Sequence, residues 1–152
     1  MANTQAFCTQ AKADLMNGLH AFGASVIRAA TTKDAYKAAL YLVSATRGAA
    51  DTIYSVTGEV SGTGYTAGGV AVTTGTAPST TGTTAFFTPS ASIVYTTVTL
   101  ATAFDAVLIY NDTSATKLAL SVHTFGSQTI TAGTLTLTMP VNDATTGLVR
   151  IA

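Results

Sequence analysis

The sequence predicts a mainly β protein: an antiparallel β-sandwich or jelly roll preceded by one N-terminal amphipathic α-helix. After Gly23 the hydrophobic period changes from 3.6 to 2, and β-branched residues, Thr above all, dominate the chain. Turn signals rich in Gly, Asn and Asp separate many short candidate strands. The 152 residues fit one folded body, which we divide into an N-terminal helix or arm (1–23) and a β-sandwich domain (24–152).

The N-terminal helix is predicted from Thr4 to Phe22. Its apolar residues recur every three or four positions and so share one face of a helix. Asn3 or Thr4 can cap its start, and Gly23 is a natural end. Such a helix needs a surface to pack on, either the protein's own sheet or a neighbouring subunit. The apolar stripe consists of Phe7, Ala11, Leu15, Leu19 and Phe22.

The strands are predicted from alternating or continuous β-branched and aromatic runs between turn signals. Many short strands with polar turns favour a sandwich or jelly roll. We expect strands at 36–43, 70–73, 84–88, 93–100, 104–110, 118–124, 128–131, 134–139 and 148–151, and turns that include 111–114, 132–133 and 142–143.

The Thr-Gly stretch from Thr73 to Thr84 has Pro78 in its middle and few large apolar residues. Such a segment is a poor core strand. We therefore expect a projecting loop, which is either a flexible surface excursion or a contact arm that orders on a neighbour.

Charge is scarce throughout the chain, at 9% of residues, and Val60–Phe104 contains no Asp, Glu, Lys, Arg or His. Proton transfer and electrostatic stabilisation need such groups, so the run favours a structural or binding role over catalysis. Seven basic and seven acidic residues cancel and form no basic patch, which disfavours nucleic acid as a partner. The absence of net charge favours a subunit of a homo-oligomer.

The chain offers little sign of secretion or membrane insertion. Cys8 is its single cysteine, and the residues from Met1 to Gln5 lack a signal-peptide pattern. No run reaches the ~18 to 20 apolar residues that a membrane-spanning helix requires. We expect synthesis in a cytoplasm and no membrane partner.

Candidate chemical sites are weak, and we predict neither an enzyme nor a bound cofactor or metal. The pattern Gly62–Ala67 matches a dinucleotide motif by letter but precedes a strand rather than a helix. His20 and His123 have no metal ligand at a suitable spacing. Glu59, the single glutamate, needs a distant aspartate such as Asp105 or Asp112 to form a catalytic pair.

One ordered set of segments is more specific. Residues 57–69 read TGEVSGTGYTAGG; AYKAALY (35–41) precedes them, FDAVLIYN (104–111) and TFG (124–126) follow, and the sequence closes on LVRIA (148–152). This order resembles small virion structural proteins of tailed bacteriophages, and the resemblance covers nearly the whole chain.

The resemblance implies a β-sandwich on the capsid surface of a virion, where it acts as a cement or decoration protein. Its partners would be the major capsid protein and further copies of itself, as a dimer or trimer. The alternative is a tail-associated structural module, or one that binds glycans or a receptor. In that case Tyr65, Tyr95 and Tyr110 could stack on sugars.

Six residues are the candidate interface, because they offer apolar anchors or a lone charge to a neighbour. In the glycine-rich segment, Gly62, Gly64, Gly68 and Gly69 permit positive φ and close backbone approach. That segment is either a contact site or an intramolecular corner. The candidate residues are Phe7, Leu15, Leu19, Phe22, Glu59 and Tyr65.

Overall fold

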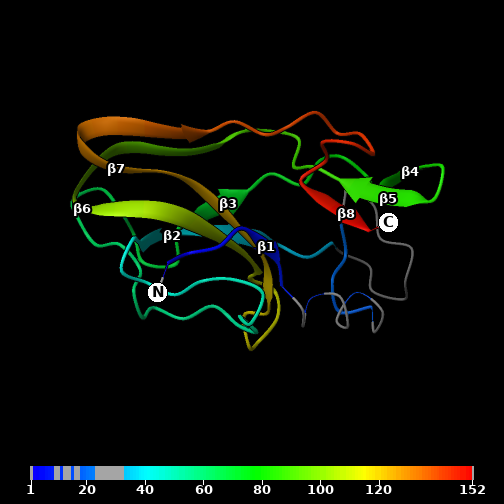
Figure 1. The fold of residues 1–152 in the computed structure, drawn as a ribbon, viewed down its shortest axis with the longest axis horizontal. Coiled ribbons are helices and arrows are strands. Elements are labelled where there is room, and N and C mark those ends of the chain that lie inside the picture. Colours follow the sequence, from blue (N-terminus) through cyan, green and yellow to red (C-terminus); the bar gives the residue numbers. More distant parts are fainter. Residues whose placement is uncertain (1, 9–10, 12–14, 16–17, 23–32, 152) are drawn as a thin grey trace.

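The computed structural model describes residues 2–8, 11, 15, 18–22 and 33–151, and it confirms a mainly β protein (Figure 1). Its strands form two antiparallel sheets, a five-stranded sheet in the order β1-β7-β6-β2-β3 and a three-stranded sheet in the order β4-β5-β8. The strands are β1 (Ala6–Phe7), β2 (Tyr36–Leu42), β3 (Val70–Val72), β4 (Ser79–Thr81), β5 (Thr84–Phe87), β6 (Ile93–Asn111), β7 (Ala119–Leu137) and β8 (Val149–Ile151).

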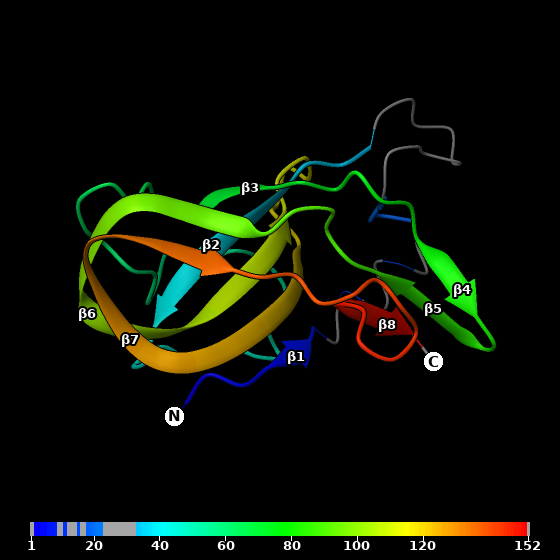
Figure 2. The ribbon, with the colours of Figure 1, turned by 90° about the horizontal axis from the view of Figure 1, so that it is seen from above.

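The hairpin of β6 and β7 dominates the large sheet, with 19 residues in each strand. The sequence predicts five shorter strands here, with a turn at 132–133. Instead the chain stays paired and bends through β-bulges, where Thr97 has φ 53° and Ala132 has φ 47°. Figure 2 shows the two strands curving round together. We call Ile93–Leu100 with Ile130–Leu137 the distal limb, and Phe104–Asn111 with Ala119–Gln128 the proximal limb.

Strand β2 lies between β3 and β6, with Ala38 opposite both Val70 and Ile109. Both of its faces are covered. On one face the distal limb reaches over it, and the hydroxyl of Tyr95 donates a 2.8 Å hydrogen bond to the carbonyl of Ala38. On the other face, the loop of residues 43–69 contributes Tyr54, which stacks on Tyr110 with ring centroids 4.7 Å apart. The later part of the same loop lies beside the distal limb, where Tyr65 stacks on Tyr95. The core therefore lies on both sides of the β2–β6 pair.

The predicted helix over Thr4–Phe22 is not supported. Ala6–Phe7 is a strand that pairs with Ser121 and Val122 of β7, and residues 19–22 are not helical. The side chain of Asn3 fastens this start to the carbonyl of Leu42. Most of the intervening residues, 9–10, 12–14 and 16–17, lie outside the described part of the chain. Pairing with a neighbouring strand overrides the helical spacing at Phe7.

The Thr-Gly stretch contains a β-hairpin rather than an irregular loop. Strand β4 pairs with β5, Thr81 opposite Thr84, around a tight turn in which Gly82 has φ 58°. A two-residue turn with a glycine at positive φ suits a hairpin, because its twist matches that of the strands. Strand β8 pairs with the other side of β5. As predicted, the hairpin projects from the body (Figures 1 and 2).

Candidate functional site

Glu59 stands at the centre of a buried hydrogen-bond cluster. The residue is only 8% exposed. The hydroxyl of Tyr65 donates to Oε1 at 2.6 Å and that of Tyr54 to Oε2 at 2.6 Å, while the backbone N–H of Gly68 donates to Oε1 at 2.7 Å. Charge-assisted bonds of this length are among the stronger ones in proteins. The lone charge that we assigned to a contact with a neighbour is thus bound within the chain.

The tyrosines of this cluster are hydrogen-bond donors at neutral pH. Burial, followed by the hydrogen bond to Glu59, raises the pKa of Tyr65 and of Tyr54 above the ordinary value for a phenol. Burial likewise raises the pKa of Tyr110 to about 12. The hydroxyl of Tyr65 also accepts a hydrogen bond from the N–H of Leu40 at 3.0 Å, which joins the loop to β2. The hydrogen bonds of this cluster therefore join the loop of residues 43–69 to the sheet.

The glycines of residues 62–69 allow this loop to lie directly on the sheet. Gly64 and Gly69 have φ 77° and 75°, and a Cβ at either would collide with backbone, that of Thr97 or of Ala38. The predicted positive φ is therefore confirmed at Gly64, Gly68 and Gly69, and close approach at Gly62. Of the two alternatives, an intramolecular corner describes this geometry.

The four apolar candidates do not form one surface. Phe7 packs against the core from β1, and Leu19 is 46% exposed. Leu15 and Phe22 meet in a surface cavity of about 110 Å³ beside the small sheet. The rings of Phe22 and Phe87 also pack together in a tilted arrangement, with centroids 4.8 Å apart. This cavity has an entirely apolar lining, completed by Pro78, Ala85, Phe86, Phe87, Val149 and Ile151.

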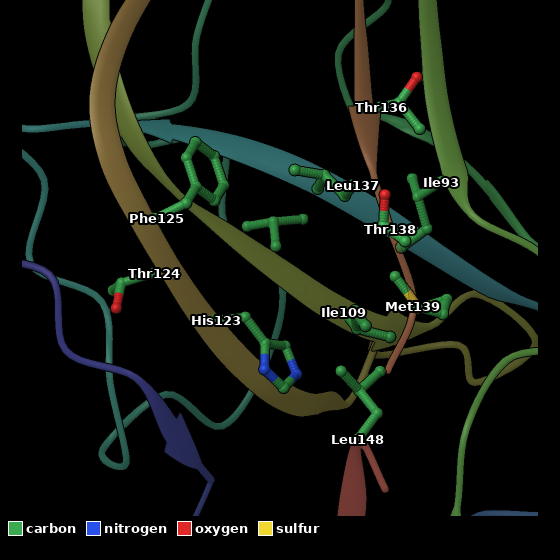
Figure 3. Close-up of a pocket in the computed structure, with 11 residues that line it drawn as sticks. Ile93, Ile109, His123, Thr124, Phe125, Thr136, Leu137, Thr138, Met139 and Leu148 are labelled. Carbon is green, nitrogen blue, oxygen red and sulfur yellow. The ribbon is translucent and has the colours of Figure 1, made fainter. Parts of the chain in front are cut away.

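A second cavity, of about 280 Å³, opens between the two limbs of the bent hairpin (Figure 3). His123 and Phe125 line it from the proximal limb and Leu137 from the distal limb, while Met139 and Leu148 close one end. Sequence reasoning did not find this cavity, because it brings together positions far apart in the chain. The alternation of His123 with Phe125 along one strand was its only local sign.

His123 is poorly placed for acid–base chemistry. Burial lowers its pKa to about 4, so the ring is neutral at physiological pH. Its Nε2 lies 2.9 Å from the hydroxyl of Ser121, and no carboxylate lines the cavity. The ring can therefore offer a neutral hydrogen-bonding group in a mainly apolar wall.

The other candidate groups are dispersed. Asp112 pairs with Lys117 and Lys37, whose cations lower the pKa of its carboxyl group, and Asp105 bonds to Asn3. Burial raises the pKa of Cys8 to about 12. Among the residues that the structure describes, no group of three or more His, Cys, Asp or Glu is placed to hold a metal ion. In the same residues, no helix has the length and apolar character to span a membrane.

Of the three tyrosines proposed for sugar stacking, two are fully buried and the third is half-buried. Tyr95 and Tyr110 are each 2% exposed, and their hydroxyls bond to backbone carbonyls within the chain. Tyr65 is half-buried, and its hydroxyl is taken by Glu59 and Leu40. The glycan-binding alternative therefore loses its aromatic platform.

Among the described residues, two exposed strand surfaces carry no charge. All three residues of β4 are exposed, and Thr side chains cover the outer face of the distal limb. Comparison with known protein families, with curated proteins and with solved structures finds no match for this chain.

Proposed function

We propose that this chain is a structural virion protein of a tailed bacteriophage. It binds the capsid shell and stabilises it by bridging neighbouring capsid subunits. The observation that carries the proposal is the small sheet, which presents an exposed, uncharged strand and an apolar cavity together. A glycan-binding tail module, the second possibility from the sequence, has no comparable observation in its favour.

The exposed strand suits pairing with another chain. β4 consists of Ser79, Thr80 and Thr81, all exposed, and it pairs with β5 on one side only among the described residues. Its free edge has backbone donors and acceptors but no charged side chain to repel a partner. An extended segment of a capsid subunit can add to this edge as a further strand.

The apolar cavity gives the same surface an anchor point. Pro78 precedes β4, and the cavity wall continues through Ala85 and Phe87 of β5 to Ile151 of β8. Its volume of about 110 Å³ is well below the ~300 to 1,000 Å³ of a typical small-molecule site. It is suited to one apolar side chain of a partner. Buried apolar anchors of this kind carry most of the energy in protein interfaces.

The rest of the protein acts as a rigid support for this contact surface. We take the curled large sheet as the body of the sandwich that the sequence predicts, with the Glu59 cluster fixing the loop of residues 43–69. One contact of this size is weak, but identical copies bound around a shell act together, since each copy that touches two subunits raises the effective concentration of the second contact. No chemical reaction is involved.

The test is binding to purified capsid shells of the virus that encodes the chain. Thr80→Lys places a charge on the free edge of β4 and should reduce binding at least about tenfold. Thr102→Lys, at an exposed position on β6, is the matched control and should bind as the parent does. Equal binding by both variants, or no binding by the parent, would contradict the proposal. Point substitutions are preferable to removing residues 1–22, which include β1 and the buried Cys8.

A further inference from the structure

The distal part of β7 is an open sheet edge. β7 pairs with β6 along its length, but its other side pairs only with β1, at Ser121 and Val122, within the described chain. From Gln128 to Leu137 that side has no neighbouring strand in the same residues. In Figure 1 this stretch runs along the upper margin of the molecule, with β6 beneath it.

This edge has neither a charge nor a proline to prevent pairing. Natural edge strands carry charges, prolines or β-bulges, or are covered, because an open edge is a template for another strand. Gln128–Leu137 contains no charged residue and no proline. It is rich in β-branched residues, which favour strand pairing. Its pairing with β6 shifts register at several points, and Ala132 has a positive φ of 47°. An uncovered edge with these properties is expected to have a partner.

The sequence of the edge points to the partner. Residues 129–136 read Thr-Ile-Thr-Ala-Gly-Thr-Leu-Thr, which has the same pattern in both directions. The bulge at Ala132 keeps the threonines on either side of it on one face, since Thr129, Thr131, Thr134 and Thr136 are all exposed. Between them, Leu135 is buried and Ile130 half-buried. A strand with this symmetry matches itself when two copies run antiparallel.

We propose that two copies of the chain pair through this edge, antiparallel, about a two-fold axis at Ala132–Gly133. Thr131 of one copy then lies opposite Thr134 of the other, Thr129 opposite Thr136, and Ile130 opposite Leu135. Threonine pairs and aliphatic pairs across antiparallel strands are both stabilising. The two large sheets join into one, and both edges disappear from solvent. Such a contact is isologous, so it closes at the dimer rather than growing into a fibre.

A charge exchange at one residue pair tests the register. In Thr131→Lys/Thr134→Lys, each of the two symmetry-related contacts brings two lysines together, and the dimer dissociation constant should rise at least about tenfold. In Thr131→Lys/Thr134→Glu, each contact brings a lysine to a glutamate, and the constant should return to within about threefold of the parent's. Thr96→Lys/Thr102→Lys adds the same charge to exposed positions of β6 and should leave dimerisation unchanged.

Sedimentation equilibrium of the full chain reads out the result. The parent should sediment as a species of twice the chain mass of 15.4 kDa, and added salt should partly restore the double-lysine dimer by screening. Unchanged melting temperatures of the separated monomers would confirm that every variant folds. A parent that is monomeric at all concentrations would overturn the proposal. So would a double-lysine variant that matches the β6 control, or a lysine–glutamate variant that stays as weak as the double-lysine one.

The dimer forms from the purified chain alone, so its failure is distinguishable from a failure to bind a capsid shell. If the parent were monomeric but its distal edge became protected from hydrogen exchange on the shell, the partner would be a foreign strand and the self-pairing would be refuted.

Discussion

Glu59 holds the long loop of residues 43–69 to the sheet, and its removal should destabilise the whole protein. Three donors converge on its carboxylate: the hydroxyls of Tyr54 and Tyr65 and the N–H of Gly68. Glu59→Ala leaves all three without their acceptor. Glu59→Gln keeps one oxygen, which can still accept from Tyr65 and Gly68, and replaces the other with a donor.

The magnitude follows from the number of orphaned groups. A buried donor without a partner costs about 1–3 kcal/mol, and the hydroxyl of Tyr54 lies close enough to solvent to regain part of this through water. We therefore expect Glu59→Ala to lower the free energy of unfolding by about 3–5 kcal/mol. For a domain of this size that corresponds to a fall of about 6 to 20 °C in Tm. Glu59→Gln should cost about 1–2 kcal/mol.

Urea denaturation followed by circular dichroism measures these differences, provided that the slope m is the same in each variant. A double-mutant cycle with Tyr54→Phe should give a coupling energy of at least about 1 kcal/mol. Asp143→Asn, an exposed carboxylate that bonds only to its own turn, is the control and should have a smaller effect. A loss below about 1 kcal/mol for Glu59→Ala, or additive effects in the cycle, would refute the reasoning.

Three further predictions concern backbone, pH and reactivity. Gly69→Ala should cost more than about 3 kcal/mol, because the new Cβ meets the carbonyl of Ala38, whereas Gly82→Ala in its open turn should cost about 1–2; urea denaturation of both separates collision from φ strain. Burial lowers the pKa of His123 to about 4, below its usual 6.5, so the free energy of unfolding should be highest above pH 6.5 and fall as the pH drops toward 4. His123→Gln should reduce this dependence on pH. An equal dependence in both proteins would contradict the role given to His123. With its pKa raised to about 12, the Cys8 thiol should resist alkylation until the protein unfolds; rapid labelling of the native protein would show the burial to be wrong.

Local patterns in the sequence were enough to place most strands, since the predicted 36–43, 70–73, 84–88 and 148–151 match β2, β3, β5 and β8 within one or two residues. They could not show that β6 and β7 are continuous. A glycine or alanine that interrupts the alternation of apolar and polar residues gives the same sequence pattern in a turn as in a β-bulge. Only the pairing of Val98 with Gly133 across the hairpin shows that this position is a bulge within a continuous strand. The helix prediction failed at Phe7 because the pairing of this residue with Ser121 of β7 is also a contact between distant parts of the chain.

For the candidate site, the sequence likewise singled out individual residues but not the contacts that they make. Glu59 and Tyr65 stood out as a lone charge and a large aromatic among glycines, and they do meet, but inside the molecule. Whether a polar side chain points inward depends on donors such as Gly68 that have no distinctive sequence signal. The cavity beside His123 needed Ile93, Leu137 and Leu148, which only the bend of the hairpin brings together. The symmetric pattern of residues 129–136 can be read from the sequence, but only the structure shows that these residues form an open edge among the described strands.

The most direct measurement of the proposed function is the number of copies in the virion. Quantitative mass spectrometry of purified particles gives the ratio of this protein to the major capsid protein. A protein that bridges neighbouring shell subunits should be present on the order of hundreds of copies per particle. Its absence from the particle, or a handful of copies as expected of a connector or tail component, would contradict the proposal.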